Sequence, residues 1–327
     1  MNNKIARGRF APSPTGLMHI GNARTALLAW LSVRSKGGTF IWRTEDLDTP
    51  RIVQGMAAAA EEDLQWMGID WDEGSGKGGG KGPYEQSLRF STYEQALDAL
   101  YQIDRIFPCT YSRKDLRTLA SAPHGAGPGK GYPVALRPEK VAPDWWQDLQ
   151  KSTSAYASIR FKVVPGVISF DDLLQGRIQQ DVSKVIGDYV VKRRDGMYAY
   201  QLAVVVDDIA MEVSEVVRGV DLLDSTARQI QLIEALGGTV PQYAHVPLVL
   251  NHEGDKLSKR DQGLTIKSLR TAGVLPEVLV GYLAYSLGFI NQIIPMKAGA
   301  LVKDFRWEHV SKNDWILPAD LIARLLG

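Results

Sequence analysis

The residues best suited to chemistry near the start of the chain are His19, Gly21 and Asn22, which follow a loop with two prolines and a glycine. Residues 5–10 before this loop predict a short strand, and apolar side chains at helical spacing within 26–31 predict a helix. The beginning of a helix after a tight turn can bind an anion, because free backbone N–H groups and the positive helix end point the same way. Gly21 has no Cβ and lets a ring approach the backbone. A triphosphate is expected here, although a single His-x-Gly is more often an ordinary turn.

A basic segment far along the chain, residues 256–260, reads Lys-Leu-Ser-Lys-Arg and follows a strand predicted at 246–250 and a turn. Two lysines on such a loop suit the neutralisation of charge on a phosphate during its transfer. Alone, this segment would be read as a solvated basic loop.

Charged side chains also follow the strand predicted at residues 40–42, namely Arg43, Glu45, Asp46 and Asp48. In an open parallel sheet, ligand groups gather beyond the carboxyl ends of the strands. Acids beside a basic residue suggest a site for a zwitterion. The beginning of a helix favours Asp and Thr as well, so Asp48 and its neighbour can equally be a cap.

Together, His-Ile-Gly-Asn and Lys-Leu-Ser-Lys-Arg resemble the signature pair of the class I aminoacyl-tRNA synthetases. Residues 9–16, Arg-Phe-Ala-Pro-Ser-Pro-Thr-Gly, and residues 42–48 resemble the glutamyl branch. Residues 193–208 and 217–223 are similar to the glutamyl-Q tRNA(Asp) synthetases, which are shortened relatives of glutamyl-tRNA synthetase. The resemblance covers most of residues 5–265.

This resemblance implies an α/β fold, a Rossmann-like doubly wound parallel sheet with an inserted α+β module and a short helical C-terminal region. We expect residues 1–103 and 191–265 to form the two halves of the catalytic domain, 104–190 the insertion and 266–327 the helical region. In the family, the insertion meets the acceptor end of the tRNA. Basic residues that can contact phosphates there, or can equally be solvated surface charges, are Arg177, Lys184, Lys192, Arg193 and Arg194.

The resemblance also implies which residues bind substrates. The expected glutamate contacts are Arg9, Ala11, Ser13, Glu45, Tyr200 and Arg218. The expected ATP contacts are His19, Gly21, Asn22, Lys256, Ser258 and Lys259, with His19, Lys256 and Lys259 as the catalytic set. Glu45 would take the amino group and Arg218 a carboxylate, which agrees with the chemistry of these side chains. The alternative is a set of buried structural ion pairs.

The sequence departs from the family pattern in three places. Asn22 replaces the last signature histidine, and Arg260 replaces the final serine. Some relatives carry a zinc site in the insertion, but Cys109 is the single cysteine here, so we expect no structural zinc and no metal ligands. Mg²⁺ is expected with ATP, held mainly by phosphates and water.

The function that the resemblance implies is ATP-dependent activation of L-glutamate and its transfer to the queuosine at the wobble position of tRNA(Asp), which would make the protein a ligase. A glutamyl-tRNA synthetase that charges the 3′ end of tRNA(Glu) is the alternative. About 67 residues follow Arg260 (327 minus 260), which is few for an anticodon-binding region. A third possibility is a non-catalytic RNA-binding relic of the fold.

The amino-acid composition is compatible with all three of these functions and does not distinguish among them. The chain has 327 residues, 45% of them hydrophobic and 23% charged, and a net charge of +1, so any contact with RNA must come from a local basic face. A single cysteine, no apolar run long enough for a bilayer and no signal-like N-terminus favour a cytoplasmic protein without a membrane partner. We expect a monomer.

Further elements are predicted from local patterns. A flexible loop is expected at 74–82, where the spacing of glycines and lysines does not fit a phosphate-binding loop, and irregular structure at 122–138. Strands are predicted at 158–163, 176–180, 204–206 and 213–217, with Asp207 and Asp208 at the end of the third. Helices are predicted at 57–64, 84–100, 225–236, 266–271, 276–287, 302–305 and 319–326.

Overall fold

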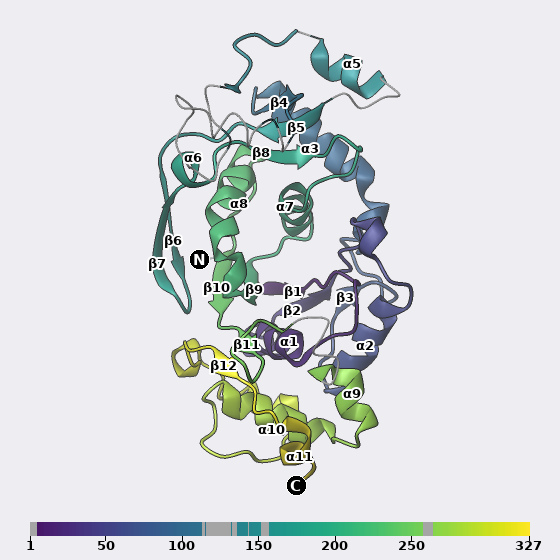
Figure 1. Ribbon diagram of the computed structural model, residues 1–327, viewed down its shortest axis with the longest axis vertical. Helices are drawn as coiled ribbons and strands as arrows, with labels where there is room; N and C mark the ends of the chain where they lie inside the picture. Colours follow the sequence, from purple (N-terminus) through teal and green to yellow (C-terminus); the bar gives the residue numbers. More distant parts are fainter. Residues whose placement is uncertain are drawn as a thin grey trace.

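The computed structural model describes residues 5–112, 115, 132, 136–142, 144–151, 157–257 and 264–327. Its centre is a seven-stranded sheet in the order β3-β2-β1-β9-β10-β6-β7 (Figure 1). Neighbours from β3 to β6 pair in parallel, and β7 is antiparallel to β6. The strands are β1 (Arg7–Phe10), β2 (Thr39–Trp42), β3 (Glu73–Gly74), β6 (Val167–Asp172), β7 (Gly176–Asp181), β9 (Glu215–Gly219) and β10 (Gln242–Val246). The predicted α/β class with a parallel sheet is confirmed.

The strand order reverses at β1. Strands β2 and β3 lie on one side of β1, and β9 and β10 lie on the other. Ligands of open α/β sheets bind beyond the carboxyl ends of the strands at such a reversal. Arg9 in β1 and Arg218 in β9 stand on the two strands that flank it.

Helix α1 (Ile20–Arg34) follows β1 and packs against β1, β2 and β9. Its side chains are buried on nearly all sides, since the C-terminal region covers the face turned away from the sheet. Arg24 of α1 is buried and donates to the carbonyl oxygens of Pro247, just after the central sheet's Val246, and of Ser286 in the C-terminal region. These bonds attach the helix to both parts of the molecule. The packing of α1 therefore fixes the position of the loop that precedes it.

A second sheet, antiparallel in the order β4-β5-β8, lies toward the upper end of the molecule in Figure 1. Several helices share a separate hydrophobic core with this sheet. These elements are β4 (Ile106–Cys109), β5 (Ser158–Phe161), β8 (Tyr189–Lys192), α3 (Phe90–Gln102), α5 (Trp145–Lys151), α7 (Tyr200–Ala210) and α8 (Leu223–Ala235). Strands β6 and β7, which come from the same part of the chain, extend the central sheet instead. The domain boundaries given above stay predictions.

The C-terminal elements gather at the lower end of the molecule (Figure 1). They are α9 (Ile266–Thr271), α10 (Pro276–Ser286), the 3₁₀ segments η6 (Ala298–Leu301) and η7 (Trp307–His309), β12 (Trp315–Ile316) and α11 (Leu321–Leu326). Strand β12 pairs in parallel with β11 (Val249–Leu250), which leads into the basic loop. No helix in the described parts of the chain combines the length and apolar character that crossing a membrane requires.

One sequence prediction is wrong in a way that matters for the site. Residues 204–206 form the middle of helix α7, not a strand, and Asp207 and Asp208 lie inside that helix rather than at a strand end. The helix is buried on several sides, so its valines read as a continuous apolar run. Such a run cannot be assigned to a strand or a buried helix by periodicity alone.

Smaller corrections concern boundaries and short elements. The strand predicted at 246–250 is divided into β10 and β11 around Pro247, which has no N–H for a strand ladder. The helix predicted at 302–305 is wrong, because the 3₁₀ segment η6 precedes it and a turn occupies 302–304. Helix α3 begins at Phe90 after a 3₁₀ segment, η2 (Gln86–Leu88), and α2 (Met56–Trp66) is longer than predicted. Most of the irregular segment 122–138 lies outside the described residues.

Candidate active site

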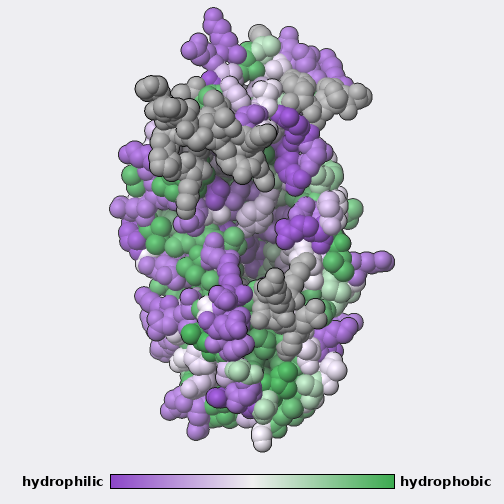
Figure 2. All heavy atoms as spheres, viewed as in Figure 1, coloured by the Kyte–Doolittle hydropathy of each residue, from purple (hydrophilic) through white to green (hydrophobic). Residues whose placement is uncertain are grey.

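A cavity of about 570 Å³ lies beyond the carboxyl ends of β1 and β2 and alongside β9. Figure 2 shows hydrophilic residues around a hollow near the middle of the molecule. The cavity brings together ten of the predicted site residues, namely Arg9, Ala11, Ser13, His19, Gly21, Asn22, Glu45, Tyr200, Arg218 and Lys256. The other two, Ser258 and Lys259, lie outside the described residues, as does Arg260.

His19 caps the N-terminus of α1. Its Nδ1 accepts from the backbone N–H groups of Gly21 and Asn22 at 3.1 and 3.2 Å, and the Asn22 side chain accepts from the His19 backbone N–H at 3.3 Å. Because Nδ1 accepts, a neutral His19 ring carries its proton on Nε2. Asn22 therefore takes part in a reciprocal cap at the position where the family signature has histidine.

The absence of a Cβ at Gly21 serves this cap. A Cβ there would lie 3.1 Å from the His19 ring and 3.4 Å from the Cβ of Val249. The sequence predicted that Gly21 lets a ring approach the backbone, and the ring that approaches it in this structure is the imidazole of His19. A side chain at this position would crowd the capping imidazole and require it to shift by a few tenths of an ångström.

A buried ion network underlies one wall of the cavity. Arg43 is fully buried and donates to Glu45 at 3.0 Å and to Asp208 at 2.7 Å. Arg9 contacts both oxygens of Asp208, at 3.2 and 3.4 Å. Burial alone would raise the pKa of Asp208, but Arg9 and Arg43 hold it below its ordinary value. For Glu45 the burial outweighs the contact with Arg43, so its pKa is raised. Arg9 and Glu45 are thus fixed by Asp208 and Arg43.

The network continues away from the cavity through Asp207. This carboxylate accepts from Arg89 at 2.5 Å, from Gln86 at 2.7 Å and from Tyr93 at 3.0 Å. The three arginines of the network, Arg9, Arg43 and Arg89, are balanced by three acids, Glu45, Asp207 and Asp208. Pairing of this kind is what buried charges require. Arg9 and Glu45 are therefore members of buried structural ion pairs, which was the predicted alternative for the glutamate-contact residues. Both also line the cavity.

Arg218 differs from these arginines. It is 5% exposed, and its guanidinium donates to His245 Nε2 at 3.0 Å, to Gln229 Oε1 at 2.8 Å and to Thr226 Oγ1 at 2.8 Å. All three acceptors are uncharged when His245 is neutral. Among the described residues, no carboxylate lies within ion-pair distance of Arg218. A buried cation beside a cavity without an internal counter-ion is suited to an anionic ligand.

The comparisons with known proteins agree with this geometry. Residues 6–320 match the family model described as tRNA synthetases class I (E and Q), catalytic domain. The chain belongs to this family. It is 45% identical to a glutamyl-Q tRNA(Asp) synthetase of Symbiobacterium thermophilum and 43% identical to one of Nitratidesulfovibrio vulgaris, and each alignment covers 98% of both chains.

Longer relatives and solved structures of this synthetase family match as well. A glutamate–tRNA ligase of a Sulfurihydrogenibium species is 37% identical, and the alignment covers 94% of this chain and 64% of the ligase. A glutamate-tRNA synthetase structure from Elizabethkingia anophelis superposes with a TM-score of 0.84 at 30% identity, covering 98% of this chain and 70% of that one. The sequence resemblance to class I synthetases is therefore confirmed.

Asp221 also lines the cavity, although the sequence patterns predict no role for it. Its carboxylate pairs with Nζ of Lys256 at 2.7 Å, and both side chains are partly exposed. This pair holds the described end of the synthetase signature loop over the cavity. Other cavity or supporting residues that received no role from the sequence are Thr25, Leu222, Thr226, Gln229, His245 and Asp208.

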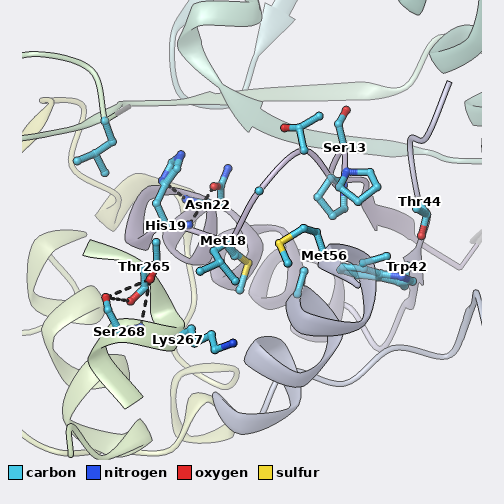
Figure 3. Close-up of a pocket in the computed structure, with 18 of the residues that line it drawn as sticks. Ser13, Met18, His19, Asn22, Trp42, Thr44, Met56, Thr265, Lys267 and Ser268 are labelled. Carbon is cyan, nitrogen blue, oxygen red and sulfur yellow. Dashed lines mark hydrogen bonds between the residues drawn. The ribbon is translucent and has the colours of Figure 1, made fainter. Parts of the chain in front are cut away.

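Two more cavities border the site. One of about 740 Å³ shares Ser13, Glu45 and Tyr200 with the first and extends toward the second sheet, where Arg193 and Arg194 line it. Another, of about 1140 Å³, lies on the other side of the 12–19 loop. Figure 3 shows side chains around this larger cavity, including Met18, Trp42, Met56 and Lys267, together with the hydrogen-bonded pair Thr265 and Ser268. Its lining is more strongly apolar than that of the first cavity.

Proposed function

We propose that this synthetase activates L-glutamate with ATP and transfers the glutamyl group to the queuosine of tRNA(Asp). The observation that carries the proposal is that Arg218 and Glu45 line the same cavity. Arg218 is a buried cation whose described partners include no carboxylate. A cation and an acid in one pocket match an amino acid that carries both an ammonium group and carboxylates. The relatives named for this activity align over 98% of their length.

In the proposed complex, Arg218 holds a glutamate carboxylate and Glu45 accepts the ammonium group. Arg9 presents its guanidinium from β1, with Ser13 and the backbone at Ala11 on the adjacent loop. Tyr200 lies at the beginning of α7 and is 38% exposed, so it forms a wall between the two neighbouring cavities. The network that fixes Arg9 and Glu45 makes the pocket rigid before the substrate arrives.

ATP would bind beside His19, Gly21 and Asn22, with Lys256, Ser258 and Lys259 closing over its phosphates. The chemistry is attack of a glutamate carboxylate oxygen on the α-phosphorus, with departure of pyrophosphate. The N–H on Nε2 of His19 and the lysine ammonium groups would neutralise charge that develops on the phosphate oxygens. Mg²⁺ enters bound to ATP in this proposal, since the cavity acid nearest the basic loop, Asp221, already pairs with Lys256.

The acceptor nucleoside would reach the adenylate through the cavity of about 740 Å³. This space opens onto the glutamate pocket at Ser13 and Tyr200 and carries the cations Arg193 and Arg194, which suit phosphates of an RNA loop. Tyr111 is 40% exposed in the same cavity and offers a surface on which a base can stack. A hydroxyl of the nucleoside would attack the glutamyl carbonyl carbon and release AMP.

The first test is glutamate-dependent exchange of pyrophosphate into ATP in the absence of RNA. We expect exchange with glutamate and much weaker exchange with glutamine or aspartate. Exchange that requires tRNA(Glu) would favour the alternative, a glutamate–tRNA ligase, whereas no exchange under any condition would favour a non-catalytic RNA-binding protein. We further propose that the enzyme is a cytoplasmic monomer, and sedimentation equilibrium would test the oligomeric state.

Zinc is not part of this proposal. Cys109 contacts the hydroxyl of Tyr132 at 3.8 Å, and that hydroxyl donates to the carbonyl oxygen of Leu136 at 2.8 Å. Within the described residues, no cluster of three His, Cys, Asp or Glu side chains has the geometry of a metal site. The absence of structural zinc stays a prediction that metal analysis can test.

A further inference from the structure

A chain of buried polar side chains leads to Arg218 from two neighbouring strands. His245 in β10 is fully buried, and its Nδ1 lies 2.6 Å from Oδ2 of Asp172 at the end of β6. Its Nε2 lies 3.0 Å from Nε of Arg218 in β9. Arg218 and His245 are direct partners in the pairing of β9 with β10, so the three side chains stand in a row across the sheet.

The hydrogen bonds determine the tautomer of His245. Asp172 also accepts from the backbone N–H groups of His245, Leu174 and Gln175, which anchors the carboxylate and makes it an acceptor toward the ring. Nδ1 of His245 must therefore carry the proton. Nε2 is left as an acceptor, and the Nε–H of Arg218 donates to it.

We infer that His245, oriented by Asp172, is a positioning residue that sets the direction of the Arg218 guanidinium toward glutamate. This inference rests on the proposed function, in which Arg218 binds a glutamate carboxylate. An ion pair with a carboxylate would hold an arginine in place by charge attraction. The described hydrogen-bond partners of Arg218 are instead all neutral acceptors, so their geometry alone must orient it. Thr226 and Gln229 hold the two terminal nitrogens, and His245 holds Nε, so the orientation of the guanidinium plane depends on all three.

This arrangement also explains why the acceptor has no charge. A carboxylate at the position of His245 would neutralise Arg218 and compete with the ligand. A neutral imidazole accepts one hydrogen bond and leaves the positive charge for the substrate. Asp172 provides the negative charge on the other side of the ring, where it fixes the imidazole. Among the described ion pairs, it pairs with His245 and not with the guanidinium of Arg218.

The test uses two substitutions of His245, and each retains one of the two ring hydrogen bonds, that with Asp172 or that with Arg218. Asn places a donor near the position of Nδ1 and keeps the contact with Asp172, but it cannot reach Arg218. Gln is longer and can place an oxygen near the position of Nε2 to accept from Arg218. Val246→Ala, in the same strand and equally buried in the core, is the matched control for loss of packing.

In the pyrophosphate exchange assay, His245→Asn should raise KM for glutamate about tenfold or more, the usual effect of losing a hydrogen bond to a charged group. Its kcat and its KM for ATP should stay within about twofold, because ground-state binding of glutamate is what changes. His245→Gln should recover most of the glutamate KM. Val246→Ala should lower thermal stability and leave KM unchanged.

Two outcomes would overturn the inference. A wild-type glutamate KM in His245→Asn would mean that Thr226 and Gln229 suffice to orient Arg218. Equal rises in KM for both His245 variants and for Val246→Ala would mean that His245 acts only in packing. The Arg218→Ala variant distinguishes failure of this inference from failure of the proposed function. If that variant keeps a wild-type KM for glutamate, then Arg218 does not bind glutamate and the proposed function itself fails.

Discussion

Replacement of Arg218 by Met tests whether this arginine is reserved for the ligand. The substitution removes a buried cation whose described partners are neutral and keeps an unbranched side chain in place of the aliphatic stem. Thr226 and His245 keep a contact with each other at 3.0 Å, and Gln229 Nε2 still donates to Gln201 at 2.7 Å, so Gln229 Oε1 is the acceptor that loses its donor. We therefore expect the free energy of unfolding of the ligand-free protein to fall by about 1–3 kcal/mol, the cost of one unsatisfied buried acceptor.

The expected loss appears when glutamate is added. A ligand at 100 times its Kd stabilises the native protein by about 2.7 kcal/mol. Leaving a substrate carboxylate unpaired in a partly buried site costs roughly 3–5 kcal/mol, by analogy with broken buried pairs, which corresponds to a fall of about 150- to 5,000-fold in affinity. At the same glutamate concentration, Arg218→Met should therefore show almost no stabilisation by ligand and near-complete loss of pyrophosphate exchange.

The assay is urea unfolding with and without glutamate, combined with exchange kinetics. Arg228→Met is the matched control, because Arg228 is a half-buried arginine on α8 that donates to Ser225 and does not line the cavity. That variant should keep the stabilisation by glutamate. If Arg218→Met is stabilised by glutamate as strongly as the wild type, or if its free energy of unfolding without ligand falls by clearly more than about 3 kcal/mol, then Arg218 is a structural residue and the reasoning fails.

Three other predictions follow from the buried charges and the single cysteine. Asp207→Asn and Asp208→Asn should each lower the free energy of unfolding by about 3 kcal/mol in urea titrations, since each leaves buried arginines short of a negative charge, and a loss below about 1 kcal/mol would contradict that role. Burial lowers the pKa of His245 below 6.5 despite the contact with Asp172, so its contribution to stability is complete above pH 6.5 and declines as the pH falls toward the folded-state pKa. His245→Gln should therefore reduce the loss of unfolding free energy with falling pH in urea titrations below pH 6.5. An unchanged pH dependence would count against the prediction. Elemental analysis of protein purified without added metal should find clearly substoichiometric zinc, and one tightly held equivalent per chain would refute the prediction.

Much of the candidate site could be predicted because its residues lie in short continuous segments. Strand β1 and the loop after it supply Arg9, Ser13 and His19 within eleven positions, and Glu45 lies three positions after the end of β2. Local patterns for strand, turn and helix identify such segments, and the resemblance to a synthetase family assigns their roles. The ten described residues of the predicted set accordingly share one cavity.

The supporting residues could not be predicted in the same way, because their partners are distant in sequence. Arg9 and Asp208 are separated by 199 positions, and His245 and Asp172 by 73. Asp208 was also assigned to the end of a strand, since the valines before it resemble a buried strand, and this error hid its position inside α7. The three-dimensional contacts of Asp208 with Arg9 and Arg43 reveal its role.

The measurement that tests the central claim most directly is glutamate transfer to purified tRNA. Three RNAs should be compared with the same enzyme and labelled glutamate, namely tRNA(Asp) that carries queuosine, tRNA(Asp) from a queuosine-deficient strain and tRNA(Glu). Nuclease digestion and mass analysis then identify the nucleoside that carries the label. We predict label on queuosine of the first RNA alone. Efficient labelling of queuosine-free tRNA(Asp), or of the 3′ end of tRNA(Glu), would contradict the account.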